Sequence, residues 1–125
     1  MSSITSVIIA TTLAALIKQA YSASIYVSPT GSGSGTIGSL YGSIQTAVNA
    51  AKAGDVIYLR VGTYSPTTNI QITKSGTVTS PTTLRPYNDE KVIIDGEGLP
   101  GTPYGLDESL PNDERCILHI EGGNY

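Results

Sequence analysis

Most acidic residues lie in the last third of the sequence, where gathered carboxylates could bind a divalent cation. Between Asp89 and Glu121 there are nine Asp and Glu residues, offset only by Lys91 and Arg115. Because Ca²⁺ takes carboxylate and carbonyl oxygens as ligands, six residues are candidates for a cation site: Asp95, Glu97, Asp107, Glu108, Asp113 and Glu114. Their spacing does not match an EF-hand loop. A solvated acidic loop is the favoured interpretation, so the sequence assigns no metal ligand.

The single cysteine and the single histidine are candidates for a nucleophile and its base. Cys116 begins an apolar stretch, and His119 follows three residues later. On a continuous strand, side chains three residues apart point to opposite faces. The sequence therefore predicts that His119 faces away from the thiol and that Cys116 is a small core residue. With one cysteine, no disulfide within the chain is possible.

Basic residues near strand ends and a glycine-rich loop are two further patterns, and neither leads to an assigned site. Lys74, Arg85 and Lys91 lie near strand ends, where basic residues most often serve solubility, so none is assigned as a catalytic base. Residues 33–38 satisfy the dinucleotide-binding pattern G-x-G-x-x-G. The next helix, however, is expected about five residues too late for such a site, and Asp55 precedes its strand rather than ending one. A flexible Gly/Ser loop is the favoured interpretation, and no catalytic or cofactor-binding residue is assigned.

The amino-acid composition argues against one class of function and limits the residue types available for the core. The net charge of −3 argues against a nucleic-acid binder, which would normally carry a basic patch. The 125 residues allow one domain at most and include eight Tyr but no Phe or Trp. The interior must therefore be built mainly from Ile, Val, Leu and Ala. Rows of β-branched residues along stacked strands meet that requirement.

The first 22 residues are predicted to be a signal peptide. Residues 7–17 form an apolar run that is too short to span a bilayer and has the length of a signal-peptide core. Small residues, Ala20 and Ser22, then stand at the positions required for cleavage between Ser22 and Ala23. No Lys or Arg precedes the run, and a buried helix is the alternative. We expect secretion, with no membrane attachment after cleavage.

The remaining chain predicts one helix followed by short strands. Residues 23–54 contain a strand at 24–28, a Gly/Ser loop and a helix over 43–52, which Ser43 begins and Gly54 ends. One apolar stripe on this helix consists of Ile44, Ala47, Val48 and Ala51. Residues 55–125 show no helical pattern, and their apolar runs, separated by turn residues, fall at 56–59, 70–72, 82–84, 92–94 and 117–120.

The spacing of these runs favours a β-solenoid over a sandwich. Ile70 and Ile93 are 23 residues apart, Ile93 and Ile117 are 24 apart, and Ile57 and Leu84 are 27 apart. Recurrence in the twenties is typical of one solenoid coil of two or three strands. No Asn-Gly or Asp-Gly pair joins two matched strands, as a hairpin would require. Residues 96–115 are interpreted as an acidic insertion within one coil.

Several segments resemble the N-terminal cap and first coil of extracellular right-handed parallel β-helix proteins. They are residues 25–31 (Ile-Tyr-Val-Ser-Pro-Thr-Gly), 42–51 (Gly-Ser-Ile-Gln-Thr-Ala-Val-Asn-Ala-Ala), 54–64 (Gly-Asp-Val-Ile-Tyr-Leu-Arg-Val-Gly-Thr-Tyr), 72–76 (Ile-Thr-Lys-Ser-Gly) and 92–96 (Val-Ile-Ile-Asp-Gly). The chain is most similar to the pectate lyases of polysaccharide lyase family nine. The resemblance implies an all-β, right-handed parallel β-helix with an N-terminal capping helix, whose apolar stripe covers the open end of the solenoid.

The resemblance also implies an activity. Pectate lyases cleave acidic plant cell-wall polysaccharide by β-elimination, in which calcium neutralises the uronate carboxylate and a basic residue removes the neighbouring proton. In the family, the catalytic Lys and the calcium ligands belong to coils further along, and no position here matches them. We therefore expect 55–125 to be the first coils of a truncated β-helix.

The alternative is a secreted, non-catalytic stub that binds cell-wall polysaccharide. Its candidate sugar-stacking residues are Tyr58, Tyr64, Tyr87 and Tyr104.

Overall fold

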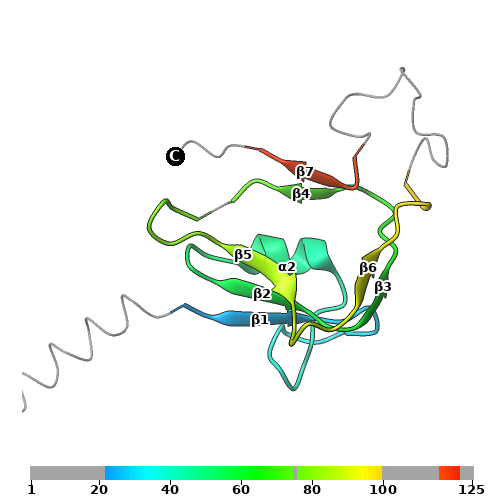
Figure 1. Cartoon of the computed structure of the whole chain (residues 1–125), viewed down its shortest axis with the longest axis horizontal. Coiled ribbons are helices and arrows are strands. Elements are labelled where there is room, and N and C mark those ends of the chain that lie inside the picture. Colours follow the sequence, from blue (N-terminus) through cyan, green and yellow to red (C-terminus); the bar gives the residue numbers. More distant parts are fainter. Residues whose placement is uncertain (1–21, 75, 100–115, 122–125) are drawn as a thin grey trace, which may run out of the picture.

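The structure is a computed structural model, and it describes residues 22–74, 76–99 and 116–121. In these ranges one helix and seven short strands follow one another (Figure 1). They are β1 (Ser24–Val27), α2 (Ile44–Ala50), β2 (Val56–Leu59), β3 (Gly62–Tyr64), β4 (Ile70–Ile72), β5 (Thr83–Pro86), β6 (Val92–Ile94) and β7 (Leu118–Ile120). No helix within these ranges is long and apolar enough to cross a membrane.

All pairings between the named strands are parallel. They form one three-stranded sheet, β1-β2-β5, and two two-stranded sheets, β3-β6 and β4-β7. The consecutive strands β2, β3 and β4 belong to three different sheets, and β5, β6 and β7 return to the same three sheets in the same order. Figure 1 shows the two shorter sheets lying apart from β1, β2 and β5. This cyclic order explains why the sequence carries no hairpin signals, because parallel neighbours need a long connection.

The register confirms one predicted spacing and corrects two others. Ile57 pairs with Leu84, as the 27-residue recurrence indicates. Ile70, however, pairs with Leu118, and Ile93 pairs with Thr63, so Ile70, Ile93 and Ile117 do not form a column. Connections of unequal length separate successive strands of each sheet, which is why a single repeat length misassigns the partners.

The predicted strand set missed β3. Gly62-Thr63-Tyr64 was not among the predicted runs, because three residues after a two-residue bend give no periodicity. Gly62 begins β3 with φ +136°, in the region that L-residues rarely adopt, and a Cβ atom there would lie 2.8 Å from Pro29 Cγ. Glycine is thus required both by the backbone conformation and by the close approach of the first loop.

The core lies between the inner faces of the strands and the helix. Alternate residues of β1 and β2 are buried, and Ile25 stacks on Ile57 while Val27 stacks on Leu59. Leu84 of β5 continues the first column and is half-buried. The core cluster has one aromatic member, Tyr64. Columns of branched aliphatic residues thus supply the packing that most small domains obtain from aromatic rings.

The helix is confirmed with shorter bounds. Ser43 is its N-cap, and the Ser43 hydroxyl accepts the backbone N–H of Thr46 at 3.4 Å. The four predicted apolar residues are all buried: Ile44, Ala47, Val48 and Ala51. The helix ends at Ala50 because Ala51 is extended, with φ −66° and ψ 146°. The prediction that Gly54 ends it was wrong; Gly54, with φ +86°, instead lies in the turn that leads into β2.

A side chain of α2 pairs with the backbone of β4 in the manner of a neighbouring strand. Gln45 Oε1 accepts the backbone N–H of Gln71 at 2.7 Å, and Gln45 Nε2 donates to the Gln71 carbonyl at 3.0 Å. The same amide nitrogen donates to Asn49 Oδ1 at 2.9 Å, which fixes its orientation. An edge of β4 that would otherwise face solvent is thereby satisfied by the helix.

Candidate functional site

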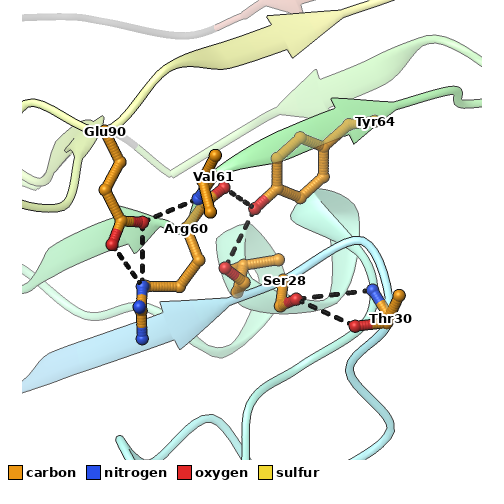
Figure 2. A network of polar contacts seen from close by, with 7 residues as sticks. Ser28, Thr30, Arg60, Val61, Tyr64 and Glu90 are labelled. Carbon is orange, nitrogen blue, oxygen red and sulfur yellow. Dashed lines mark hydrogen bonds and ion pairs between the residues drawn. The ribbon is translucent and has the colours of Figure 1, made fainter.

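A polar network ties the corner between β2 and β3 to the first strand (Figure 2). The Tyr64 hydroxyl lies 2.9 Å from the carbonyl oxygens of both Val27 and Arg60, so its one proton is shared between two acceptors. The Tyr64 ring belongs to the core, and burial raises the pKa of its phenol to about 12. This hydroxyl holds the corner in place and is not available as an acid or base near neutral pH.

The outer side of the same corner is held by an ion pair. Arg60 Nε donates to both carboxylate oxygens of Glu90, at 2.9 and 3.1 Å, and the backbone N–H of Val61 donates to Glu90 at 2.7 Å (Figure 2). The hydrogen bond from Arg60, followed by that from Val61, lowers the pKa of Glu90. Glu90 thus joins the turn after β5 to the bend between β2 and β3, two segments 30 residues apart.

Two of the four tyrosines proposed to stack on sugars, Tyr58 and Tyr87, form a cluster with Tyr26 in which they contact other rings and guanidinium groups. On the outer face of the first sheet, the rings of Tyr26 and Tyr58 stack with centroids 5.3 Å apart, and Tyr87 packs edge-on against both. The guanidinium of Arg60 lies 5.0 Å from the Tyr87 centroid, and that of Arg85 lies 5.7 Å from the Tyr58 centroid. A sugar would have to displace these groups, so the cluster is better explained as packing. Tyr64 is buried, and Tyr104 lies outside the described residues.

A hydroxyl-rich cleft lies where the start of α2 meets β3 and the β3–β4 turn. It encloses about 440 Å³, and its polar lining consists of Ser43, Gln45, Thr63, Tyr64, Ser65, Thr67 and Thr68. Pro29, Gly42, Ile44, Pro66 and Ile70 complete its walls. Tyr64 is the only ionisable residue of this lining, and its hydroxyl is engaged at the corner. The cleft can therefore exchange hydrogen bonds with a polar ligand, but its lining provides no group able to remove a proton from carbon.

Cys116 and His119 are closer than the sequence suggests. Cys116 Sγ lies 3.9 Å from His119 Nδ1, and His119 Nε2 lies 2.9 Å from Glu121 Oε1. The expectation that His119 faces away from the thiol was wrong, because Cys116 precedes β7 and the alternation of a strand does not extend to it. The imidazole thus lies between the thiol and the carboxylate, within hydrogen-bond distance of both.

The acidic candidates do not form a cation site within the described ranges. There, no three His, Cys, Asp or Glu side chains lie close enough to hold a metal ion. Asp95 Oδ1 accepts the backbone N–H of Glu97 at 3.0 Å, which is a local turn. Four of the six candidates, Asp107, Glu108, Asp113 and Glu114, lie outside the described residues.

The other candidate residues named from the sequence are either exposed or hydrogen-bonded within the fold. Lys74, Arg85 and Lys91 are exposed. In the Gly/Ser loop, the N–H groups of Gly33 and Gly35 donate to the carbonyls of Leu40 and Ser39, so they do not point at a ligand. Asp55, which the dinucleotide interpretation would have assigned to a ribose, is buried against backbone N–H groups.

Comparison with known proteins identifies the family. Residues 25–122 match the family described as Pel9A-like, right-handed β-helix region. The match includes every named strand except the first residue of β1, and the cyclic order of the three parallel sheets agrees with it. The chain belongs to this family.

Two relatives and one solved structure are similar to this chain. The chain is 59% identical over 114 residues to "Pectate lyase PEL9" of Emericella nidulans, which covers 90% of this chain and 28% of that protein. It is 37% identical over 82 residues to the uncharacterised protein YwoF of Bacillus subtilis, covering 64% of this chain and 17% of YwoF. A solved structure titled "Glycoside hydrolase" matches with a TM-score of 0.56 and 30% identity, over 60% of this chain and 15% of that one. The chain thus spans less than a third of each relative.

Proposed function

We propose that the chain is part of a secreted pectate lyase that acts on acidic pectic polysaccharide, and that its residues contribute the cap and initial coils of the β-helix rather than the catalytic groups. The 59% identity to a pectate lyase is the observation that carries this proposal. The proposal includes a signal peptide over 1–22, which lies outside the described residues except for Ser22. It also includes closure of the three sheets into a right-handed solenoid.

In this proposal α2 is the cap of the solenoid. Its buried face packs on the core formed by β1, β2 and β4, and Gln45 satisfies the backbone of β4. A solenoid needs such an element at its end, because a terminal coil would expose its apolar interior. Gln45→Ala should leave two backbone groups of Gln71 without protein partners and lower the melting temperature. Asn49→Ala, which removes only the contact to the Gln45 amide, is the matched control.

The described residues do not fit a calcium site, so no catalytic step is assigned to them. Among these residues, no three His, Cys, Asp or Glu side chains lie close enough together to hold a metal ion, and the polar side chains that line the cleft carry hydroxyls and one amide. Calcium-assisted β-elimination, as proposed for the lyase, therefore depends on residues other than those described.

A chimera tests the proposal. The segment of the Emericella lyase that aligns with this chain would be replaced by residues 25–122, and cleavage of polygalacturonate would be followed by the ultraviolet absorbance of the unsaturated product. We expect calcium-dependent activity similar to that of the parent lyase, and none from the chain alone. A folded but inactive chimera would contradict the proposal that residues 25–122 can replace the aligned segment of the Emericella lyase. Activity of the chain alone would contradict the non-catalytic role.

The hydroxyl-lined cleft favours a second candidate, a polysaccharide-binding function without catalysis. Ser, Thr and Gln side chains offer donors and acceptors that suit sugar hydroxyls. The double change Ser65→Ala and Thr67→Ala should weaken retention of the chain in gels containing pectic polysaccharide. Thr46→Ala, at an exposed position of α2 outside the cleft, is the control. Equal retention of the two variants would exclude the cleft as a binding site.

A further inference from the structure

Asp55 is the one charged residue within the described core. Its exposed fraction is 6%, and it lies in the turn between α2 and β2. Asp55 Oδ1 accepts the backbone N–H of Ala23 at 2.9 Å, and Asp55 Oδ2 accepts the backbone N–H of Lys52 at 2.9 Å. Both carboxylate oxygens are therefore directed at main-chain nitrogens.

The carboxylate has hydrogen bonds but no cation paired with it. The ion pairs of the described residues are Arg60–Glu90 and His119–Glu121, and Lys52 meets Asp55 through its backbone N–H. A buried charge is unfavourable unless it is paired as well as hydrogen-bonded. The main chain around Ala23 is meanwhile fixed, because the Ala23 carbonyl accepts the backbone N–H of Val56 at 3.0 Å. The nitrogen facing Asp55 is thus held in place by the first rung of the β1–β2 ladder.

We infer that Asp55 is the receptor for a free α-amino group at Ala23. This inference rests on the proposed secretion, in which a signal peptidase hydrolyses the Ser22–Ala23 bond. Water adds across that peptide bond: Ser22 keeps the new carboxylate, and the Ala23 nitrogen becomes an amine that takes up a proton. The neutral amide at 2.9 Å from Asp55 Oδ1 is then replaced by an ammonium group at the same position, and the buried carboxylate gains its ion-pair partner.

The stability of the fold should therefore depend on which residue is first in the chain. A chain that begins at Ala23 places the cation against Asp55. A chain with one additional residue keeps the neutral amide there and moves the cation about 3.8 Å further along the backbone. Removal of the signal peptide would therefore complete a structural contact as well as release the chain.

The test compares chains with different first residues. Ala23–Tyr125 would be released from a cleavable fusion, and compared with the same chain after α-acetylation and with a chain that begins at Ser22. We expect the acetylated chain and the chain that begins at Ser22, in both of which the Ala23 nitrogen is a neutral amide, to melt lower than the free Ala23 form, by about 4 °C or more. Asp55→Asn should abolish the difference. Asp89→Asn, an exposed carboxylate in a left-handed turn that Asn tolerates, should preserve it.

Two results would overturn the inference. Equal melting temperatures of the free and acetylated forms would show that the ammonium adds nothing, and an unchanged difference in Asp55→Asn would assign the effect to another group. If Asp55→Asn does not fold, the inference is tested by the rate at which the α-amino group is acylated. The α-amino group of Ala23, paired with Asp55, should react at least tenfold more slowly than the α-amino group of the chain that begins at Ser22. Equal rates would contradict the inference. No polysaccharide is used, so the outcome is independent of the lyase proposal.

Discussion

The β1-β2-β5 sheet and the β4-β7 sheet are built from similar residues but differ in how well they are buried. In the first sheet, the inward residues of β1 and β2 form closed columns, and Val27 and Ile57 are 0% and 1% exposed. In the second, Ile70 is buried, whereas Leu118 and Ile120 are 40% and 63% exposed. The difference teaches that strand position, rather than residue type, decides the contribution of an aliphatic side chain, because a side chain is buried only where other elements pack against it.

The largest expected effect compares one isoleucine from each sheet. Ile57→Ala removes a fully buried side chain and should lower the free energy of unfolding by about 2–5 kcal/mol. Ile120→Ala removes a largely exposed one and should change it by about 0.5 kcal/mol or less. Urea unfolding followed by circular dichroism measures both. Equal losses of unfolding free energy in the two variants would contradict this comparison, because they would show that Ile120 is packed as closely as Ile57.

The next effect concerns the corner that anchors the first sheet. Tyr64→Phe removes the hydroxyl that donates to the Val27 and Arg60 carbonyls, and the Val27 carbonyl keeps only the backbone N–H of Arg60, so we expect a loss of about 1–2 kcal/mol. Burial raises the pKa of Tyr64 to about 12, above its value of about 10 in the unfolded chain. Its stabilising contribution is therefore complete below about pH 10 and is lost as the pH rises through 12. Melting temperatures across that range should fall more steeply for the native chain than for the Phe variant.

A smaller effect is expected at acid pH. The Arg60 hydrogen bond lowers the pKa of Glu90, so the contribution of Glu90 is present above its unfolded pKa of about 4.3 and is lost as the pH falls below it. Glu90→Gln keeps the side-chain shape but removes the charge. The variant should melt below the native chain at neutral pH, and the gap should narrow as the pH falls below about 4.3 and the carboxylate of Glu90 takes up its proton. A gap that persists in acid would assign the effect to packing.

The smallest effect concerns the residues around β7. If His119 accepts the Cys116 proton, His119→Ala should slow alkylation of the thiol by iodoacetamide at neutral pH several-fold without a large change in stability. Glu121→Gln should slow it less, because it alters only the partner of the imidazole. Equal alkylation rates in all three chains would show that the contact does not activate the thiol.

The sequence predicted the elements with local signals and missed those that depend on partners far along the chain. The apolar stripe and Ser43 gave α2, alternation gave β1, and short apolar runs between turn residues gave β2, β4, β5, β6 and β7. The strand that contains Tyr64 was missed, although the Tyr64 hydroxyl reaches Val27, 37 residues earlier. Gln45 gave no signal, because an amide that pairs with Gln71 looks like any polar residue on the exposed face of a helix.

The site predictions divide in the same way. The interpretation of the acidic residues as a solvated loop stays a prediction, because four of the six candidates lie outside the described residues. The contact of Cys116 with His119 could not be predicted, because it depends on where β7 begins. The Arg60–Glu90 pair also escaped prediction. Its two residues are 30 positions apart, and β3, β4 and β5 lie between them.

Pro86 at the end of β5 has a consequence for behaviour at high concentration. The backbone N–H groups of Thr83 and Tyr87 point toward β2, so the nitrogen of Pro86, in the alternate phase, lies on the opposite edge of the strand. Among the described strands, β5 has a neighbour on the β2 side only. A strand from another molecule that approached the opposite edge would meet a ring in place of a donor, which discourages edge-to-edge aggregation at this position.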